Sequence, residues 1–399
     1  MRATRIVVLG AGIIGAACAR ELALAGCEVI VVDRGGPAAA TTAHGEGNVL
    51  VSDKGPGPEL ELARLSRRLW PEVLAEGGRP AEWEPKGGIV VATTEAGAED
   101  LRGFAASQRE AGVRAEPLSA AELAAAEPHL ARDVTAAFAY PEDAQVQPSG
   151  AASVLLGAAL RAGAVLRTGC EVLGPVSRGG RITGVRTTLG LIEGDAFVNA
   201  AGPWAGELSA RLGAPVDVRP RRGEVLVTAP MPPTVFHKVY DADYVGAVGS
   251  GSGDLQTSAV VESTRAGTIL LGSSRRRVGF DDRLHPGVLS RIAAKALRLF
   301  PCLSGAAVMR AYGGFRPYVP DHLPLIGPDP RLSGLWHATG HEGAGIGLSV
   351  GTARLLADGL LSREPEMDIT PFRVDRPLAL AEPGSPPAAG RAVPGGEQP

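Results

Sequence analysis

A glycine-rich turn near the N-terminus constrains this chain more than any other feature. It stands between an apolar run at 5–9 and a helix-forming stretch at 13–25, and a second apolar run follows at 28–33. The residues concerned are Gly10, Gly12, Gly15 and the acid Asp33. Such glycines permit a tight turn and the close approach of a pyrophosphate to a helix N-terminus, while the acid accepts ribose hydroxyls. The pattern predicts a dinucleotide site; an ordinary glycine turn is the alternative, and the fingerprint does not separate NAD from FAD.

A second glycine-rich segment near the C-terminus favours FAD. The run 340–347 reads GHEGAGIG, follows a predicted strand at 335–339 and opens a predicted helix at 345–361. A helix N-terminus stabilises negative charge, and a reduced flavin carries its charge near N1 and O2. A flexible glycine loop is the alternative interpretation.

Composition narrows the function classes. The 399 residues carry a formal charge of -3, which gives no basic field for nucleic acid. The four cysteines, Cys18, Cys27, Cys170 and Cys302, lack the spacing of an iron–sulfur, zinc or dithiol site, so no metal site is expected. Motifs of metallohydrolases, serine hydrolases and P-loop enzymes are absent. No apolar run is long enough to span a membrane, and glycines interrupt the signal-peptide-like run at 1–19, so a cytoplasmic location is expected.

The order of elements predicts two interleaved domains. The expected fold class is α/β, with a Rossmann-like cofactor domain and an α+β substrate domain on a mostly antiparallel sheet. Beyond the N-terminal unit, helices are predicted at 59–74, 148–162, 204–212 and 286–299, and strands at 87–93, 134–140 and 164–176, with a hairpin of 181–187 and 190–199 and further strands over 216–271. The cofactor domain is assigned to 1–50, 142–214 and 312–376, the substrate domain to 51–141 and 215–311, and a disordered tail to 377–399.

Several sequence blocks together resemble one known superfamily. In order, they are DAQVQP at 143–148, VNAAGPW at 198–204, PRRGEVLV at 220–227, TILLG at 268–272, VGFD at 278–281 and GFRPYVPDHLPLIG at 314–327. With the two glycine loops, these blocks resemble the FAD-dependent D-amino-acid oxidase, glycine oxidase and sarcosine oxidase superfamily. The stretch 45–54 and the C-terminal glycine loop look most like opine-oxidase, hydroxyproline-dehydrogenase and hydrogen-cyanide-synthase type flavin subunits.

The resemblance implies a set of FAD contacts. Arg34 would flank the ribose or adenine, Thr41 and Thr42 would approach the pyrophosphate, and Gly47 and Asn48 would lie along the ribityl chain or the ring. The remaining implied contacts, beside Gly10, Gly12, Gly15 and Asp33, are Val172, Ala201, Gly202, Gly343, Ala344, Gly345, Ile346 and Gly347. Sarcosine oxidases attach their flavin to a cysteine in the segment that matches 313–316. This chain has none there, so the FAD is expected to be noncovalent.

Arg316 is the main expected substrate residue. The superfamily places an arginine of this block above the flavin, where its forked donors bind the substrate carboxylate; an ordinary salt bridge is the alternative. His44 and His341 stand beside the two cofactor loops, and Glu46 is expected either to recognise the substrate amine or to pair with Arg34 or a loop N–H. His237, Tyr240 and Tyr244 are expected to form the roof of the pocket.

The resemblance implies hydride transfer from the carbon that bears nitrogen to flavin N5, followed by hydrolysis of the imine to an oxo acid. The substrate would be an amino acid or a small amine, and the electron acceptor oxygen or a partner subunit. Sarcosine oxidases use a lysine over the flavin, and none of the four lysines falls in a matching segment, which favours a dehydrogenase.

Three alternatives stay open. One is a flavin subunit that passes electrons to an iron–sulfur partner. The others are a subunit that holds FAD without catalysing a reaction, and a nicotinamide dehydrogenase.

Overall fold

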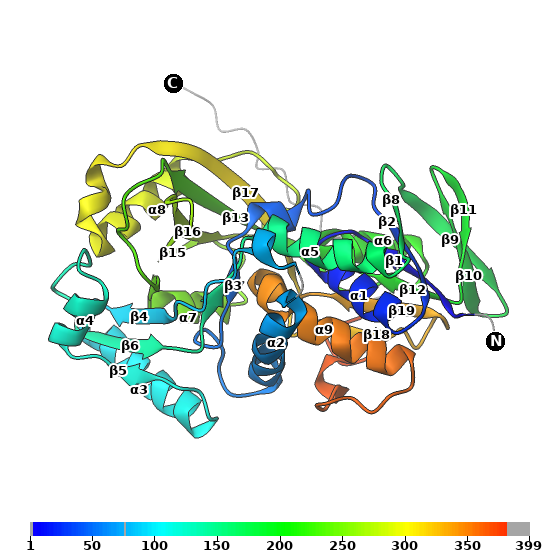
Figure 1. Cartoon of the computed structure of the whole chain (residues 1–399), viewed down its shortest axis with the longest axis horizontal. Coiled ribbons are helices and arrows are strands. Elements are labelled where there is room, and N and C mark those ends of the chain that lie inside the picture. The colour runs from blue at the N-terminus through cyan, green and yellow to red at the C-terminus, as the bar shows by residue number, and fades with distance from the viewer. Residues whose placement is uncertain (1–2, 76, 381–399) are drawn as a thin grey trace.

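Two large β-sheets organise the protein (Figure 1), and the computed structural model describes residues 3–75 and 77–380. The first sheet has the strand order β18-β19-β12-β1-β2-β8 and is parallel except for the β18–β19 pair. Its strands are β1 Arg5–Leu9, β2 Glu28–Val32, β8 Val165–Arg167, β12 Ala196–Asn199, β18 Leu325–Pro328 and β19 Leu335–Thr339. The expected strand, helix and strand at the N-terminus are therefore confirmed as β1, α1 and β2.

Both faces of the central strands β1, β2 and β12 are covered, which explains why these strands are mostly apolar. Ile6 and Val8 face the helices α1, α5 and α9, whereas Val7 and Leu9 face a three-stranded antiparallel sheet. The three helices are α1 Ile13–Leu24, α5 Pro148–Arg161 and α9 Gly345–Leu360. The small sheet consists of β9 Val172–Arg178, β10 Arg181–Thr187 and β11 Gly190–Glu193, and helix α6 Ala205–Arg211 contacts β9. The alternation of side chains along β1 thus separates two apolar cores.

The second sheet has eight strands in the order β17-β13-β16-β15-β14-β4-β6-β5 and is antiparallel except for the β14–β4 pair. Its strands are β4 Gly88–Ala92, β5 Glu116–Pro117, β6 Ala136–Tyr140, β13 Arg219–Thr228, β14 Lys238–Asp241, β15 Gln256–Ser263, β16 Ile269–Arg275 and β17 Val308–Tyr318. Helix α8, Pro286–Leu299, packs on one face through Val288 and Ile292. The remaining helices are α2 Pro58–Leu74, α3 Glu95–Glu110, α4 Ala120–Ala126 and α7 Asp243–Val248. The expected fold class is confirmed.

The structure corrects three sequence predictions. The strand predicted at 164–176 divides into β8 of the parallel sheet and β9 of the small sheet, because the chain turns between them. Residues 190–199 do not form one hairpin arm, because they divide into β11 in the small sheet and β12 in the parallel sheet. The predicted disorder of 377–399 is wrong for 377–380, where Ala379 is buried and its carbonyl accepts a hydrogen bond from Asp217 N at 2.8 Å. Residues 381–399 lie outside the described residues. The domain boundaries stay a prediction, and the one drawn at 312 falls inside β17.

The buried carboxyl group of Asp143 bonds the segment 51–52, which in turn is bonded by strand β14. Asp143 Oδ1 accepts hydrogen bonds from Val51 N at 2.9 Å and Ser52 N at 3.3 Å, and Asp143 Oδ2 contacts the Ser52 hydroxyl. Tyr240 on β14 donates its hydroxyl to the same Ser52 oxygen. Burial raises the pKa of Asp143 to about 7, against the stabilising effect of these hydrogen bonds on the ionised form.

We expect Asp143 to make folding pH-dependent. Because its folded pKa of about 7 exceeds the ordinary aspartate pKa of 3.8, its contribution is full below about pH 4 and is lost as the pH rises through 7. Asp143→Asn cannot ionise, so its free energy of unfolding should fall less than that of the wild type between pH 5 and pH 8. The two slopes should differ by up to about 1.4 kcal/mol per pH unit. Urea unfolding at each pH measures this, with Asp100→Asn on the exposed side of α3 as control; parallel curves for wild type and Asp143→Asn would contradict it.

Candidate active site

A long pocket runs between the two sheets and is lined by both glycine loops. At one end lie Glu171 and Arg211, and at the other lie Tyr244 and Arg316. Most of the residues singled out from the sequence line it: Gly10, Gly12, Asp33, Arg34, Thr41, Thr42, His44, Glu46, Asn48, Val172, Ala201, Gly202, Tyr244, Arg316, His341, Gly343, Gly345 and Ile346. Six do not: Gly15, Gly47, His237, Tyr240, Ala344 and Gly347. The structure therefore brings together segments that are more than 300 positions apart in the sequence.

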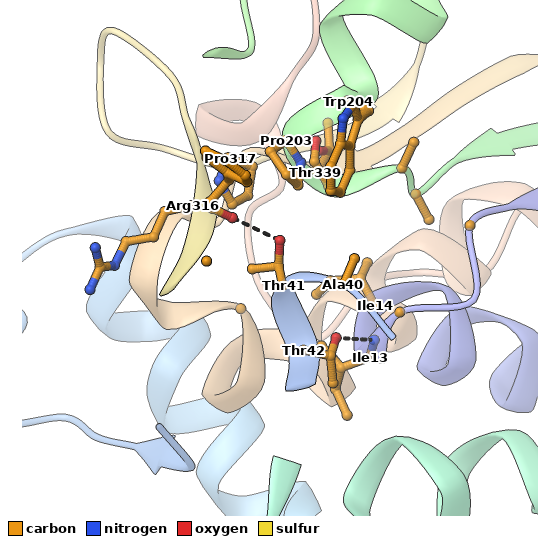
Figure 2. A pocket seen from close by; sticks show the side chains of 18 of the residues that line it. Ile13, Ile14, Ala40, Thr41, Thr42, Pro203, Trp204, Arg316, Pro317 and Thr339 are labelled. Carbon is orange, nitrogen blue, oxygen red and sulfur yellow. Dashed lines mark hydrogen bonds between the residues drawn. The ribbon is translucent and has the colours of Figure 1, made fainter. Parts of the chain in front are cut away.

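The N-terminal glycines are required by close backbone contacts. Gly10 has φ +120°, and a Cβ atom there would lie 2.5 Å from Ala200 O. A Cβ atom on Gly15 would lie 1.9 Å from Gly10 O, so Gly15 holds α1 against the turn instead of lining the pocket. Thr42 Oγ1 accepts a hydrogen bond from Ile13 N at 3.0 Å at the start of α1 (Figure 2). The turn and helix N-terminus fit a pyrophosphate.

The adenosine end is organised by Asp33. Its Oδ2 accepts a hydrogen bond from Ala11 N at 2.8 Å and its Oδ1 accepts one from Gly35 N at 2.7 Å, which fixes the carboxylate at the end of β2. The Arg34 guanidinium lies 4.5 Å above the Trp204 ring. The Val172 carbonyl, expected near the adenine, accepts a hydrogen bond from Arg211 at 2.6 Å.

The C-terminal glycine loop supports the other end of the cofactor site. Gly343, Gly345 and Ile346 line the pocket at the start of α9, while Gly347 packs on the backbone of Asn48, where a Cβ atom would lie 2.9 Å from Asn48 O. The backbone approaches Gly47 even more closely, because a Cβ atom there would lie 1.6 Å from Val146 O. Gly47 and Gly347 therefore shape the loops through packing. The N–H groups of the two helix N-termini, the glycine cradle and the Asp33 carboxylate, which is an acceptor, together fit FAD.

His341 is held neutral beside this loop. Its Nε2 lies 2.9 Å from the Thr352 hydroxyl, and its Nδ1 is buried without a hydrogen-bond partner among the residues that the structure describes. Burial lowers the pKa of His341 to about 3. At neutral pH the ring is therefore an uncharged hydrogen-bonding group and carries no proton for acid catalysis.

Arg316 crosses from β17 over the neighbouring strand β13. Its Nη1 donates a hydrogen bond to Ser274 O on β16 at 2.8 Å, and it lies above Gly223, where a Cβ atom would be 2.2 Å from Nη1. In Figure 2 the guanidinium points away from the Trp204 end of the pocket. Burial and the neighbouring Arg275 lower its pKa to about 10, so it remains protonated at neutral pH.

Glu46 is buried in the same pocket and does not pair with Arg34. Its Oε2 accepts hydrogen bonds from Asn48 Nδ2 at 3.1 Å and from Lys238 Nζ at 3.3 Å. Its Oε1 is buried without a hydrogen-bond partner among residues 3–75 and 77–380. A Cβ atom on Gly272 would lie 2.2 Å from Oε1, so that glycine makes room for the carboxylate.

Lys238 was missed as a site residue because its partners come from distant segments. Its Nζ contacts Asn48 Oδ1 and donates to Glu262 Oε2 at 2.8 Å as well as to Glu46. Burial alone would lower its pKa, but the charges of Glu262 and Glu46 raise the pKa above the ordinary lysine value. The lysine is therefore a fixed cation that holds Glu46 and Asn48 in place.

Only one of the three residues expected to cover the pocket lines it. Tyr244 lines the pocket, but Tyr240 donates to Ser52 in the core, and His237 turns to Glu127, with 2.9 Å between Nδ1 and Oε1. The placement of His237 and Tyr240 in the pocket is thus wrong, because buried polar partners hold both side chains elsewhere. His44 lines the pocket, and its Nδ1 donates to Ala40 O at 2.7 Å, which leaves Nε2 as the acceptor nitrogen.

Two further arginines lie beside Arg316 and were not identified from the sequence. Arg221 stands opposite Arg316 in the β13–β17 pair and bonds Glu342 at 3.2 Å. Arg275 ends β16 and lies 4.6 Å from the Tyr244 ring. Only four of the 40 basic residues are lysines, so arginines are abundant in the sequence. Which of them lie beside Arg316 depends on the strand register.

The described residues hold neither a metal-binding cluster nor a membrane-spanning helix. Within 3–75 and 77–380, no cluster of His, Cys, Asp and Glu could hold a metal ion. No helix in those ranges is long and apolar enough to cross a bilayer.

Comparison with known proteins identifies several relatives. The chain is 32% identical to the glycine oxidase of Geobacillus kaustophilus over 93% of this chain and 96% of that one, and the crystal structure of glycine oxidase from that organism superposes with a TM-score of 0.84 over 94% of this chain and 99% of that one. It is 31% identical to the bifunctional protein ThiO/ThiG of Trichormus variabilis over 93% of this chain, and it spans 55% of that protein's length. It is 29% identical to the hydrogen cyanide synthase subunit HcnC of Pseudomonas aeruginosa over 94% of this chain and 98% of that subunit.

Most of the chain also matches one family. Residues 5–359 match the DAO family, described as FAD dependent oxidoreductase. This range includes both glycine loops and Arg316. The chain belongs to the DAO family of FAD-dependent oxidoreductases.

Proposed function

We propose that this protein oxidises the CH–NH bond of an amino acid or an N-substituted amino acid with noncovalently bound FAD. The observation that carries the proposal is the presence of Arg316 and Glu46, two charges of opposite sign, in one pocket with the cofactor loops. Arg316 offers a donor fork for a carboxylate, and Glu46 Oε1 offers an acceptor for an amine. An amino acid is a small molecule with both groups on one carbon.

The residues bind and orient the substrate. Arg316 would hold the carboxylate and Glu46 the amine, which fixes the carbon between them against the cofactor. When bound, FAD supplies the acceptor for the hydride that leaves this carbon. The substrate also loses a proton from nitrogen, and water hydrolyses the resulting imine to an oxo acid and ammonia or an amine. Glu46 Oε1, which lacks a hydrogen-bond partner among the described residues, would accept that proton.

Noncovalent attachment is supported by the positions of the cysteines. Cys170 lines the pocket, but it does so beside Glu171 at the adenosine end. Cys18 is buried and Cys302 is exposed, and neither Cys18, Cys27 nor Cys302 lines the pocket. Among the described residues, the one cysteine that lines the pocket therefore lies at 170 and not in the segment 313–316, where a tether to the ring is expected.

The electron acceptor is proposed to be a partner protein or a quinone in place of oxygen. The buried Lys238 bonds two pocket-lining residues, Glu46 and Asn48, and its ammonium also serves Glu262. The likeness to HcnC, which is named as a subunit, supports the narrower assignment to opine-oxidase, hydroxyproline-dehydrogenase or hydrogen-cyanide-synthase type flavin subunits. A cytoplasmic location stays a prediction.

The proposed function is tested by anaerobic reduction. The FAD-loaded protein is mixed without oxygen with glycine, sarcosine, D- and L-proline, the acidic amino acids and their amides, and the flavin band is recorded. The proposal expects bleaching by at least one compound with formation of the oxo acid, and release of all flavin on acid precipitation. A flavin that no amino acid or N-substituted amino acid reduces would contradict it, and readmission of oxygen then separates an oxidase from a dehydrogenase.

Gly223→Ala should displace the Arg316 guanidinium with little effect on folding. The added Cβ atom would lie 2.2 Å from Nη1, the mobile end of a long side chain, so the side chain would move and the strand would remain. We expect kcat/KM for amino acids to fall on the order of 10- to 100-fold while FAD content is unchanged. Gly103→Ala, on the exposed face of α3 with open space around it, is the control. Equal kinetics for Gly223→Ala and wild type would refute the assignment of Arg316.

Glu46→Gln should weaken binding of the amine and spare binding of the carboxylate. The amide keeps the size of the side chain but carries no charge to attract an ammonium group. We expect kcat/KM for amino acids to fall by about 10-fold or more, since a hydrogen bond to a charged group is lost. Propanoate, which has no amine, should bind as well as before when followed through the flavin spectrum. If propanoate and the amino acid weaken equally, Glu46 has only a structural role.

A further inference from the structure

A line of three charged side chains begins at the substrate end of the pocket and continues into the large sheet. Glu46 lines the pocket, and its side chain is 7% exposed. Lys238 Nζ lies 3.3 Å from Glu46 Oε2 and 2.8 Å from Glu262 Oε2, and the Lys238 and Glu262 side chains are 2% and 1% exposed. Val239 pairs with Val261 across β14 and β15, so Lys238 and Glu262 are opposite neighbours on one face of the sheet.

Three oxygens along this line are buried without a hydrogen-bond partner among residues 3–75 and 77–380. They are Glu46 Oε1, Glu262 Oε1 and Gln145 Oε1. Buried acceptors are normally bonded to the protein or to an ordered water molecule, and polar surroundings favour the water. These oxygens therefore indicate positions for water inside the sheet, beyond the pocket that holds the substrate.

A second pocket lies at the other end of the line. It has a volume of about 650 Å³ and is lined by Glu84, Lys86 and Ser263, among others. Ser263 directly follows Glu262 at the end of β15, and its carbonyl accepts a hydrogen bond from Lys86 Nζ at 2.6 Å. Lys86 Nζ also lies 3.6 Å from Glu84 Oε2. Burial lowers the pKa of Lys86, and the charge of Glu262 opposes this effect, so Lys86 and Glu262 are electrostatic neighbours.

Gln145 connects the same two ends by a second route. Strand β3, Asn48–Val49, pairs with β7, Ala144–Gln145, which places Asn48 opposite Gln145. The Asn48 side chain contacts Lys238, and Gln145 Nε2 donates to the Ser263 carbonyl at 3.0 Å. Polar groups therefore extend without a break in the chain of contacts from the pocket-lining Asn48 to the residues of the second pocket.

We infer that Glu46, Lys238 and Glu262 form a proton path, along which the proton from the substrate nitrogen leaves the active site and reaches solvent at the second pocket, beside Lys86 and Glu84. This inference rests on the proposed oxidation of amino acids, in which Glu46 accepts that proton. The carboxylate must lose the proton before the next turnover, and a bound substrate covers its side that faces the cofactor pocket. The path gives the proton an exit on the other side.

The transfer returns every group to its starting state. When the hydride leaves the substrate carbon, the N–H bond breaks and the proton joins Glu46 Oε1. A half-turn of this carboxyl group presents the proton to Lys238, which takes it up while it gives one of its own protons to Glu262 Oε2. After a half-turn of its own, Glu262 releases the proton to water that leads to the second pocket. Both glutamates end as carboxylates and Lys238 ends as an ammonium group.

The test compares flavin bleaching with the release of protons to solvent. The FAD-loaded protein is mixed without oxygen with the amino acid that bleaches it fastest, in weakly buffered solution with a coloured pH indicator. In the wild type, proton release should keep pace with bleaching. In Glu262→Gln the side chain keeps its size but cannot take up a proton, so release should lag behind bleaching on the order of 10-fold or more. A purely structural defect would slow both signals together.

Glu99→Gln, at an exposed position on α3, is the matched control and should show no lag. Release that keeps pace with bleaching in Glu262→Gln would overturn the inference and leave the proposed function intact.

Lys86→Met tests the solvent end of the path and decides the question if Glu262→Gln does not fold. It removes the ammonium group between Glu262 and the second pocket, so a lag is expected here too. Lys295→Met is its control, because Lys295 also donates to a carbonyl of β15, that of Thr257 at 2.7 Å, but from helix α8. Equal traces for Lys86→Met and Lys295→Met would contradict the proton path.

A crystal structure of the FAD-loaded protein, at a resolution that shows ordered water, does not depend on turnover. Water should bond Glu262 Oε1 and connect it with Lys86 Nζ in the second pocket. If no compound reduces the flavin, the proposed function fails, and this structure alone decides whether the path exists. A Glu262 Oε1 without bonded water would then reject it.

Discussion

Two glycines within the large antiparallel sheet make the substrate end of the pocket possible. Gly223 on β13 leaves the space that the Arg316 guanidinium occupies, and Gly272 on β16 leaves the space for the Glu46 carboxylate. A glycine inside a strand weakens the strand and leaves it without a side chain to pack, so its presence here marks a close approach by another group. Both approaching groups are charged, and both come from segments outside the two glycine-bearing strands.

Charge balance explains the remaining geometry. Lys238 is satisfied by Glu262 and Glu46, and Arg221 by Glu342, so these ion pairs are complete within the protein. No carboxylate among the described residues pairs with Arg316, and burial together with the nearby charge of Arg275 lowers the pKa of Arg316. Because Arg316 lines the pocket, the pocket is prepared for an anion, whose binding removes an existing electrostatic cost.

The sequence predicted the cofactor end well because local patterns determine it. The turn at 10–15, the acid at 33 and the loop at 340–347 each combine a strand end, glycines and a helix start, and no distant pairing is needed to interpret them. Arg316 was identified through a motif. Arg275 and Lys238 were not, since their roles depend on which strands are neighbours in the eight-stranded sheet.

The wrong predictions also arise from contacts between segments that are distant in the sequence. Residues 190–199 carry the alternation of a hairpin, but the apolar stretch 196–199 is buried on both faces in the parallel sheet. His237 and Tyr240 lie next to the pocket region in sequence, yet Glu127 and Ser52 satisfy their polar atoms in the interior. The signal that sequence reasoning passed over was the isolated glycine at 223 within a run of strand residues.

The most direct test of the account is a crystal structure of the FAD-bound protein with propanoate, a carboxylate that has no amine to oxidise. The account predicts that the carboxylate lies against the Arg316 guanidinium, over Gly223, with its methyl end toward the flavin ring. A propanoate held elsewhere, with Arg316 bonded only to Ser274 O, would contradict the claim that this arginine binds the substrate.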